Sequence, residues 1–287
     1  MNDGSGIDEE CSRIEARMKA ADDRLKVVQI HYGSPIHDEN LVLRSCGLGP
    51  QFESYLQLLF ASALDHLKLF AATLRANGMP HLYAEYSLIR TSLTASSYAL
   101  WLLLDDDDAR RLNLLKFVFK DLDDLSSWAR TDVSGPGTGL TDQVNGDGLA
   151  QATAKTQQSI VDEANAVERR RRGNDEYTRG VSDYKKERLT DSSVVGHASS
   201  SAAGASELLS MWKFMSGYAH GRYWPSLVTA VMTSEVGRLG VRKFTYAGDP
   251  QQLLKASHLA LDVIDAALQQ LETLAKPRVR PPVGGPS

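Results

Sequence analysis

The chain has 287 residues, of which 42% are hydrophobic and 24% charged, the composition of a globular protein with a substantial core. Its net charge of -4 excludes a general attraction for nucleic acid, so any such binding must come from a local basic patch. Two distant cysteines, Cys11 and Cys46, exclude a disulfide framework and a zinc knuckle.

The N-terminus and the apolar runs of the chain both argue against a membrane protein. The N-terminus is polar and acidic, unlike a signal peptide. The longest apolar run, residues 99–104, is far shorter than the ~20 residues that span a bilayer. We therefore expect a cytoplasmic protein without membrane association.

Helical periodicity dominates the first half of the chain. Residues 1–48 are predicted to form a charged N-terminal helix, over 7–30, and a connector. Residues 49–131 are predicted to hold three core helices, because apolar side chains recur at steps of three and four over 52–74, 86–104 and 112–125. The short connection between the first two predicts an antiparallel hairpin.

The second half is more mixed. Residues 132–205 are interpreted as a glycine-rich loop, a charged helical arm over 149–188 and a Ser-rich linker from residue 191. Residues 206–276 are predicted to hold the C-terminal core helices, the last over 251–275. Alternating runs within 227–246 indicate a small β-hairpin, although the first run is also compatible with a helix. Residues 277–287, rich in proline, are expected to be disordered.

These elements predict an all-α fold. It is an antiparallel helical bundle of four core helices, to which the N-terminal helix and the charged arm are added.

The main candidate site is the segment of residues 211–225, where an apolar helix ends among large aromatic rings. Lys213, Ser216 and His220 fall on one helix face at spacings of three and four, with Tyr218 and Arg222 beside them. A histidine in such a position can transfer protons near neutral pH, and a cation beside it can hold a phosphate. The alternative is a structural histidine at a helix end that Gly221 terminates.

The order of these helices resembles the HEPN superfamily. The resemblance covers roughly residues 50–130 and 206–275, and rests on the helix with internal Arg90 and on the late segment from Ser216 to Gly221. It implies a homodimer, and a metal-independent endoribonuclease of bacterial defence or toxin–antitoxin systems. The family motif is an Arg, four to six residues and a His, in which the Arg positions phosphate and the His assists attack by the 2′-hydroxyl. Lys213 stands where the motif has Arg, and lysine lacks the bidentate fork of arginine.

Arg90 lies on a largely apolar helix, where a charge must be paired or face a cavity. One interpretation is a structural ion pair with Glu85, Asp65 or a more distant carboxylate. The other is a supporting role in a site with His220.

Two charged runs have competing interpretations. Asp105, Asp106, Asp107 and Asp108 invite a metal site, but helix capping and the helix dipole account for them, so we expect no metal and no cofactor. Arg169, Arg170, Arg171 and Arg172 are candidate contacts for nucleic-acid phosphates, or one solvated helix face, since acidic residues interleave with the neighbouring cations.

Two functions follow from these patterns. The first is a HEPN-like protein that cleaves RNA or binds nucleotides, with His220 as the acid or base, Lys213 or Arg222 on the phosphate, and Arg90 in support. The second is a non-catalytic scaffold that binds a partner protein. In that case Trp212, Tyr218, Tyr223 and Trp224 are core or interface packing.

Overall fold

The computed structural model describes residues 4–81, 83–104, 106–132, 146–201, 206–225, 231–236 and 242–278. Ten α-helices and one pair of short strands form the secondary structure of these residues, so the predicted all-α class is confirmed. The described residues fall into two compact units. The first draws on 1–28, 56–103 and 191–273, and the second on 29–55, 104–190 and 274–287.

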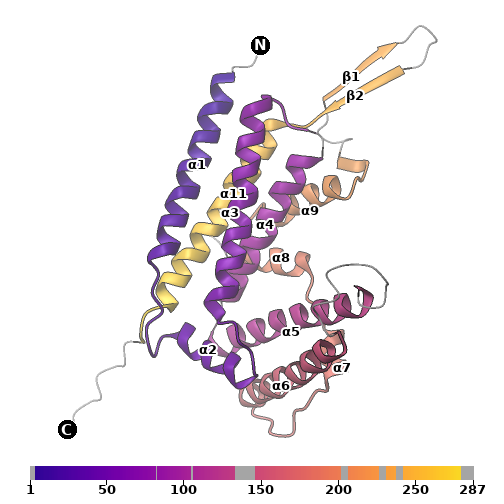
Figure 1. The fold of residues 1–287 in the computed structure, drawn as a ribbon. Coiled ribbons are helices and arrows are strands. Elements are labelled where there is room, and N and C mark those ends of the chain that lie inside the picture. The colour runs from indigo at the N-terminus through magenta and orange to yellow at the C-terminus, as the bar shows by residue number, and fades with distance from the viewer. Residues whose placement is uncertain are drawn as a thin grey trace. The chain divides into compact units, whose positions relative to one another are not determined.

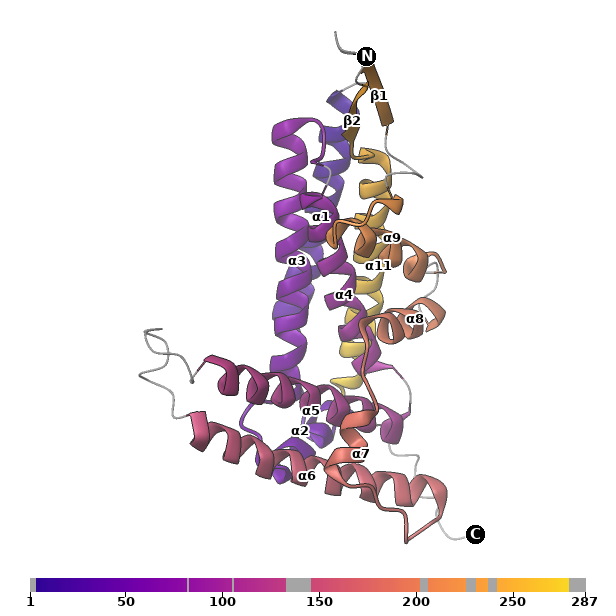
Figure 2. The same cartoon turned by 90° about the vertical axis from the view of Figure 1, so that its right-hand side faces the viewer.

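Four long helices build the first unit. They are α1 (Gly4–Val27), α3 (Phe52–Asn77), α4 (Ala84–Leu103) and α11 (Pro250–Leu274). These helices lie side by side, and α3 and α4 run in opposite directions as predicted (Figures 1 and 2). Two shorter helices, α8 (Asp191–Ser201) and α9 (Leu208–Ala219), pack on α4 and on each other.

The apolar stripes predicted for α3, α4 and α11 form the core of the first unit. On α3 the apolar residues spaced at steps of three and four are buried except Leu59, namely Leu56, Ala63, Leu67, Phe70 and Leu74. On α11 the corresponding residues are all buried, namely Leu254, Leu261, Ile264, Leu268 and Leu271. The charged helix α1 joins α11 along its flank, where Arg17 bonds Asp262 at 2.7 Å and Asp265 at 2.8 Å. Its narrow apolar stripe includes Cys11, which is fully buried.

A strand pair lies within the range expected for a hairpin. Strand β1 (Val231–Val236) pairs antiparallel with β2 (Arg242–Ala247), in a register that sets Val231 opposite Ala247. Residues 226–230 and 237–241 lie outside the described ranges.

The second unit contains α2 (Pro35–Ser45), α5 (Asp107–Asp132), α6 (Gly146–Arg172) and α7 (Val181–Lys186). Helices α5 and α6 pack against each other, and Cys46 is buried with 3% of its surface exposed. The sequence assigned α5 to the same bundle as α3 and α4, whereas its contacts lie with α2 and α6. Ser34 caps α2 by accepting a hydrogen bond from the His37 backbone N–H, and Pro35 fills the first turn.

The prediction of a Ser-rich linker was also wrong. The segment assigned to a Ser-rich linker forms α8 for eleven residues. Val194, Val195 and Ala198 recur at helical spacing and are buried, so a narrow apolar stripe outweighs the serine and glycine content. Of the predicted glycine-rich loop, residues 133–145 lie outside the described ranges, and so do residues 279–287 of the predicted tail.

Candidate functional site

The candidate site lies where the C-terminal end of α9 packs beside the start of α4. Helix α9 ends with His220 as its C-cap, and Gly221 adopts a left-handed conformation at φ 63°. The Gly221 N–H donates to the Tyr218 carbonyl at 2.8 Å, and the Arg222 N–H donates to the Gly217 carbonyl at 2.9 Å. This is a Schellman motif, and it turns the chain sharply so that residues 222–225 fold back over the helix end.

The polar residues predicted for this site are accessible. His220, Lys213 and Arg222 are exposed, and Ser216 is half-buried. Within the described part of the chain, the side chains of His220, Lys213 and Arg222 form no hydrogen bond or ion pair. These three groups therefore remain available to a ligand.

Tyr218 does not belong to that exposed set, because its ring is fully buried. Its centroid lies 4.0 Å from that of Tyr86 on α4 and 5.2 Å from that of Phe214. Burial raises the pKa of Tyr86 well above its usual range, and its hydroxyl accepts the Asp249 N–H at 3.0 Å. The buried rings thus fix the end of α9 to the start of α4 and to the start of α11.

Other rings at the same end stay in solvent. Tyr223 is 63% exposed, Tyr83 47% and Trp224 46%. Trp224 also packs against Phe214 at a centroid distance of 5.9 Å, and Tyr83 against Tyr218 at 6.2 Å. The aromatic cluster is therefore divided, with Trp212 and Tyr218 in the core and Tyr223 and Trp224 at the surface.

Arg90 is engaged elsewhere in the first unit. Its Nη2 lies 3.4 Å from Asp191 Oδ2 at the start of α8, and its guanidinium stacks on the Trp212 ring at 5.4 Å. Tyr98 donates to the other Asp191 oxygen at 3.1 Å, and Trp212 donates through Nε1 to Thr94 at 2.8 Å. The pairing with a distant carboxylate is thus observed, and Arg90 holds α8 and α9 on α4.

A histidine that the sequence analysis did not single out also lies at this end. His81 Nδ1 is 2.7 Å from Glu85 Oε1, where the imidazole is 62% exposed and the carboxyl is fully buried. The i, i+4 spacing of a His and a Glu at a helix start was visible in the sequence, but that spacing alone is common on solvated helices.

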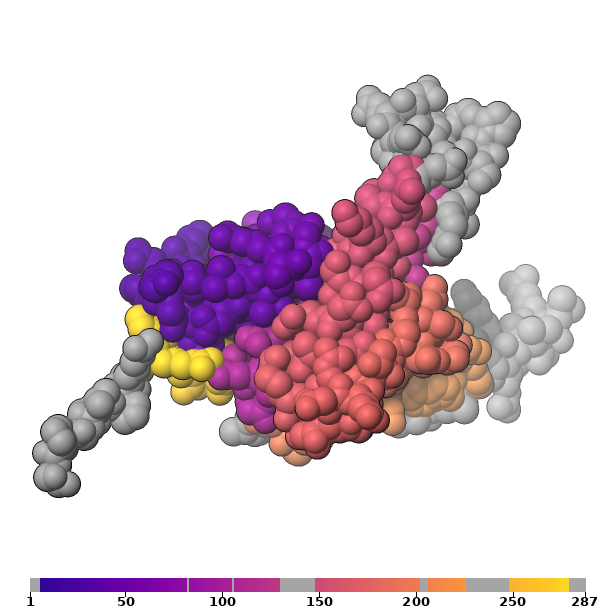
Figure 3. Space-filling model, turned by 90° about the horizontal axis from the view of Figure 1, so that it is seen from below, coloured from indigo at the N-terminus to yellow at the C-terminus, as the bar shows by residue number. Residues whose placement is uncertain are grey.

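The arginine cluster belongs to the second unit, at the end of α6, and most of it is occupied. Arg169 donates to the Tyr177 carbonyl at 3.2 Å, Arg170 lies 3.4 Å from Asp108, and Arg172 bonds Glu168 at 2.9 Å. Arg171 is exposed. These pairings favour the solvated helix face over a phosphate-binding patch. Figure 3 shows the surface of α6 and α7 in pink to red.

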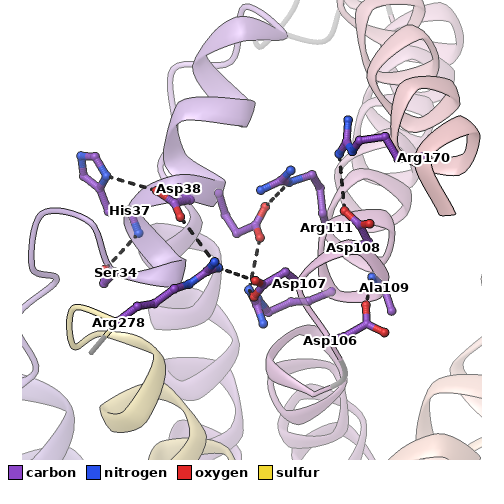
Figure 4. A network of polar contacts seen from close by, with 12 residues as sticks. Ser34, His37, Asp38, Asp106, Asp107, Asp108, Ala109, Arg111, Arg170 and Arg278 are labelled. Carbon is purple, nitrogen blue, oxygen red and sulfur yellow. Dashed lines mark hydrogen bonds and ion pairs between the residues drawn. The ribbon is translucent and has the colours of Figure 1, made fainter. Parts of the chain in front are cut away.

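The aspartate run serves the second unit structurally. Asp106 accepts the Ala109 N–H at 2.8 Å, which caps α5, while Asp107 pairs with Arg110 and Arg278 (Figure 4). Asp105 lies outside the described residues. No cluster of three or more metal-ligating side chains occurs among the residues that the structure describes.

Beneath that run lies a buried ion-pair network. Glu39 of α2 is fully buried, with Oε2 2.9 Å from Arg111 Nε and Oε1 3.4 Å from Arg110 Nη2, and Arg110 is itself 2% exposed. Burial raises the pKa of Glu39, and the two guanidiniums oppose that rise. All its cations are paired with carboxylates, so the network holds α2 on α5 rather than offering a free charge.

The fold and the site together define a helical protein with exposed histidine, cationic and aromatic side chains at one helix-pair end. The chain matches no protein-family profile, no curated protein and no solved structure at a significant level. None of the described helices combines the length and the apolar character that crossing a membrane requires.

Proposed function

We propose that the end of the α4–α9 pair binds single-stranded RNA and cleaves it without a metal, in the manner of the HEPN proteins that the sequence resembles. The observation that carries the proposal is the exposure of His220, Lys213 and Arg222 beside three accessible aromatic rings. Cations that track phosphates, together with rings on which bases stack, are the two components of single-strand recognition.

Each group has a chemical task in this proposal. The imidazole of His220 removes the proton from a ribose 2′-hydroxyl, which attacks the adjacent phosphorus. Arg222 and Lys213 neutralise the phosphate oxygens as their negative charge grows. Tyr223 and Trp224 stack on the flanking bases. Arg90 and Asp191 act indirectly, because they hold the helices that present these groups. The resemblance to HEPN proteins also implies a homodimer and a role in bacterial defence or toxin–antitoxin systems, and both are part of the proposal.

Incubation of the purified protein with mixed single-stranded RNA, in the presence of a metal chelator, tests the proposal. We expect the wild type to cleave and His220→Ala to lose at least about 100-fold in rate, because general acid–base groups contribute roughly that much. The matched control is His31→Ala, which removes an exposed imidazole of the second unit. Equal cleavage by wild type and His220→Ala, or none by either, would remove the nuclease assignment.

A second candidate function, protein binding, is favoured by a separate observation. Helices α1 and α3 border a groove of about 760 Å³ with Met18, Leu58 and Ala61 in its lining. Leu58 is 70% exposed, and acidic and basic side chains of both helices rim the groove. A rim that carries both signs of charge allows opposite charges to pair across a two-fold axis, and the partner we propose for this groove is a second copy of the chain.

Sedimentation equilibrium, which measures the molecular mass in solution, tests whether the chain dimerises through this groove. We expect a concentration-dependent dimer that Leu58→Lys abolishes, whereas Leu41→Lys, an exposed leucine of α2, leaves it intact. A wild type that stays monomeric over the concentration range, or an equal effect of both substitutions, would contradict the groove as a dimer interface.

A further inference from the structure

An exposed histidine, His81, pairs with a buried carboxylate, Glu85, where the chain passes from α3 to α4. Glu85, in the first turn of α4, is fully buried, yet its Oε1 lies 2.7 Å from Nδ1 of His81, whose side chain is 62% exposed. A carboxylate behind an imidazole fixes the ring orientation and holds the proton on Nδ1. The other nitrogen, Nε2, is then free to exchange a proton with a ligand.

Packing alone does not account for this pair. The second carboxylate oxygen, Glu85 Oε2, is buried and has no hydrogen-bond partner among the described residues. A buried carboxylate oxygen without a partner lowers the stability of the fold. A neutral side chain at position 85 would start α4 without that cost, so helix formation alone does not explain the carboxylate. An oriented histidine in front of a buried carboxylate is the arrangement that proton-transfer sites use.

The pair lies at the same end of the α4–α9 pair as His220. Tyr83, two residues after His81, contacts Tyr218, two residues before His220, with ring centroids 6.2 Å apart. The backbone around His81 is also fixed, because Gly248 packs so closely that an added Cβ would lie 3.2 Å from the His81 carbonyl oxygen. The segments that carry His81 and His220, both exposed, therefore meet at the Tyr83–Tyr218 contact although they lie far apart in the sequence, and we name the exposed end of the α4–α9 pair the aromatic surface.

We infer that His81 is the second proton-transfer residue of this surface, and that Glu85 positions it. The inference rests on the proposed RNA cleavage. His220 removes the 2′-hydroxyl proton, the 2′-oxygen forms a bond to phosphorus, and the bond from phosphorus to the 5′-oxygen breaks. His81 Nε2 gives its proton to that departing 5′-oxygen. The products are a 2′,3′-cyclic phosphate and a 5′-hydroxyl, and no further reactant enters the step.

A substrate with an easier leaving group tests this role directly. In RNA with a single bridging 5′-sulfur, the thiolate departs without a proton, so the general acid becomes dispensable. We expect His81→Ala to lose at least about 100-fold in rate on normal RNA. On the sulfur-bridged RNA it should cleave at the wild-type rate, whereas His220→Ala should stay slow on both.

Glu85→Gln keeps the size of the side chain and removes its charge. We expect a smaller loss than for His81→Ala on normal RNA, and the same recovery on the sulfur-bridged RNA. A loss that arose only from damaged structure would appear on both substrates. His66→Ala is the matched control, because among the described residues this half-buried histidine of α3 bonds only the Ser62 carbonyl of its own helix.

The outcomes separate the two proposals. If the wild type cleaves and His81→Ala cleaves normal RNA equally well, the inference is overturned and the proposed function stands. A deficit of His81→Ala on both substrates also overturns it, because the residue would then bind or support rather than donate a proton. No cleavage of either substrate by the wild type overturns the proposed function and the acid role together.

Discussion

At the scale of single residues, the end of α9 depends on two glycines with different physical roles. Gly221 supplies the positive φ of the Schellman turn. Gly217 supplies space, since a Cβ there would lie 2.6 Å from Pro225 Cγ and 2.8 Å from the Trp224 ring. The returning segment that carries Arg222 and Tyr223 is therefore seated directly on the face of the helix.

Gly217→Ala should consequently displace Pro225 and Trp224. We expect a loss of about 1–3 kcal/mol in the free energy of unfolding from overpacking, and a change in tryptophan fluorescence. Urea unfolding measures the first effect and the emission maximum of the folded protein the second. Gly6→Ala is the control, because nothing lies within 4 Å of a Cβ added at that position. Equal stability of Gly217→Ala and wild type would contradict this prediction, because Pro225 and Trp224 would then move away from residue 217 at no cost in free energy.

Tyr55 gives a prediction for alkaline pH. Burial, together with the charge of Asp121, raises the pKa of Tyr55 from 10.0 to about 12. The unfolded chain therefore ionises first, and the stability due to neutral Tyr55 is complete below pH 10 and lost as pH rises through 12. Between pH 9 and pH 11.5 the wild type should lose on the order of 1–2 kcal/mol more than Tyr55→Phe. Urea unfolding at the two pH values checks this, and parallel losses in the two proteins would contradict it.

The sequence predicted the residue-scale features unevenly. The shared helix face of Lys213, Ser216 and His220, and the helix end at Gly221, follow from local pattern, because each depends on neighbours in sequence. The exposure of His220 was left open between a site and a structural histidine, and the structure decides it. The partner of Arg90 does not, since Asp191 is 101 residues away and only the fold brings the two together. His81 was missed because its distinction is the complete burial of Glu85, which no local pattern encodes.

At the scale of elements, the long helices were predictable and the short ones were not. Over 25 residues an apolar period is unmistakable, as α3 and α11 show. Helix α8 has only three buried positions among serines and glycine, so its conformation is decided by what it packs against. Helix α2 was missed because residues 31–48 were assigned to a connector, although Ser34 and Pro35 form a helix start; its eleven residues are too few to show a clear apolar period.

Because packing decides α8, its N-terminal anchor should control its stability. Asp191→Ala removes the acceptor of both Arg90 and Tyr98. We expect a loss of about 1 kcal/mol, since the carboxylate is 39% exposed and partly screened by solvent. Amide hydrogen exchange should accelerate in α8 before it does in α3. Asp65→Ala, an exposed carboxylate of α3, is the control, and unchanged exchange in α8 would show that the ion pair is not its anchor.

At the scale of the whole molecule, each unit is held by its own set of charges. Arg17 and Arg24 of α1 bond carboxylates of α11 in the first unit, where the partners are partly exposed. In the second unit, Glu39 lies fully buried between Arg110 and Arg111. Breaking a buried pair by removing one partner leaves an uncompensated charge, which costs far more than losing an exposed pair.

Glu39→Ala should therefore destabilise the second unit by about 3–5 kcal/mol. Hydrogen exchange should rise across α2, α5 and α6, and the α3 core of the first unit should change little. Glu176→Ala, an exposed carboxylate of the second unit, should be silent. A uniform rise in exchange over both units would instead show that they unfold as one cooperative body.

The two cysteines give each unit its own chemical reporter. Cys11 lies in the first unit and Cys46 in the second, and these are the only two thiols of the chain. Burial raises the pKa of Cys11, and it raises that of Cys46 to about 11, so neither thiol reacts readily in the folded state. The rate at which a disulfide reagent labels each position then measures how often that unit opens. Mass spectrometry of the two peptides would give both opening rates from one unmodified protein, without any introduced probe.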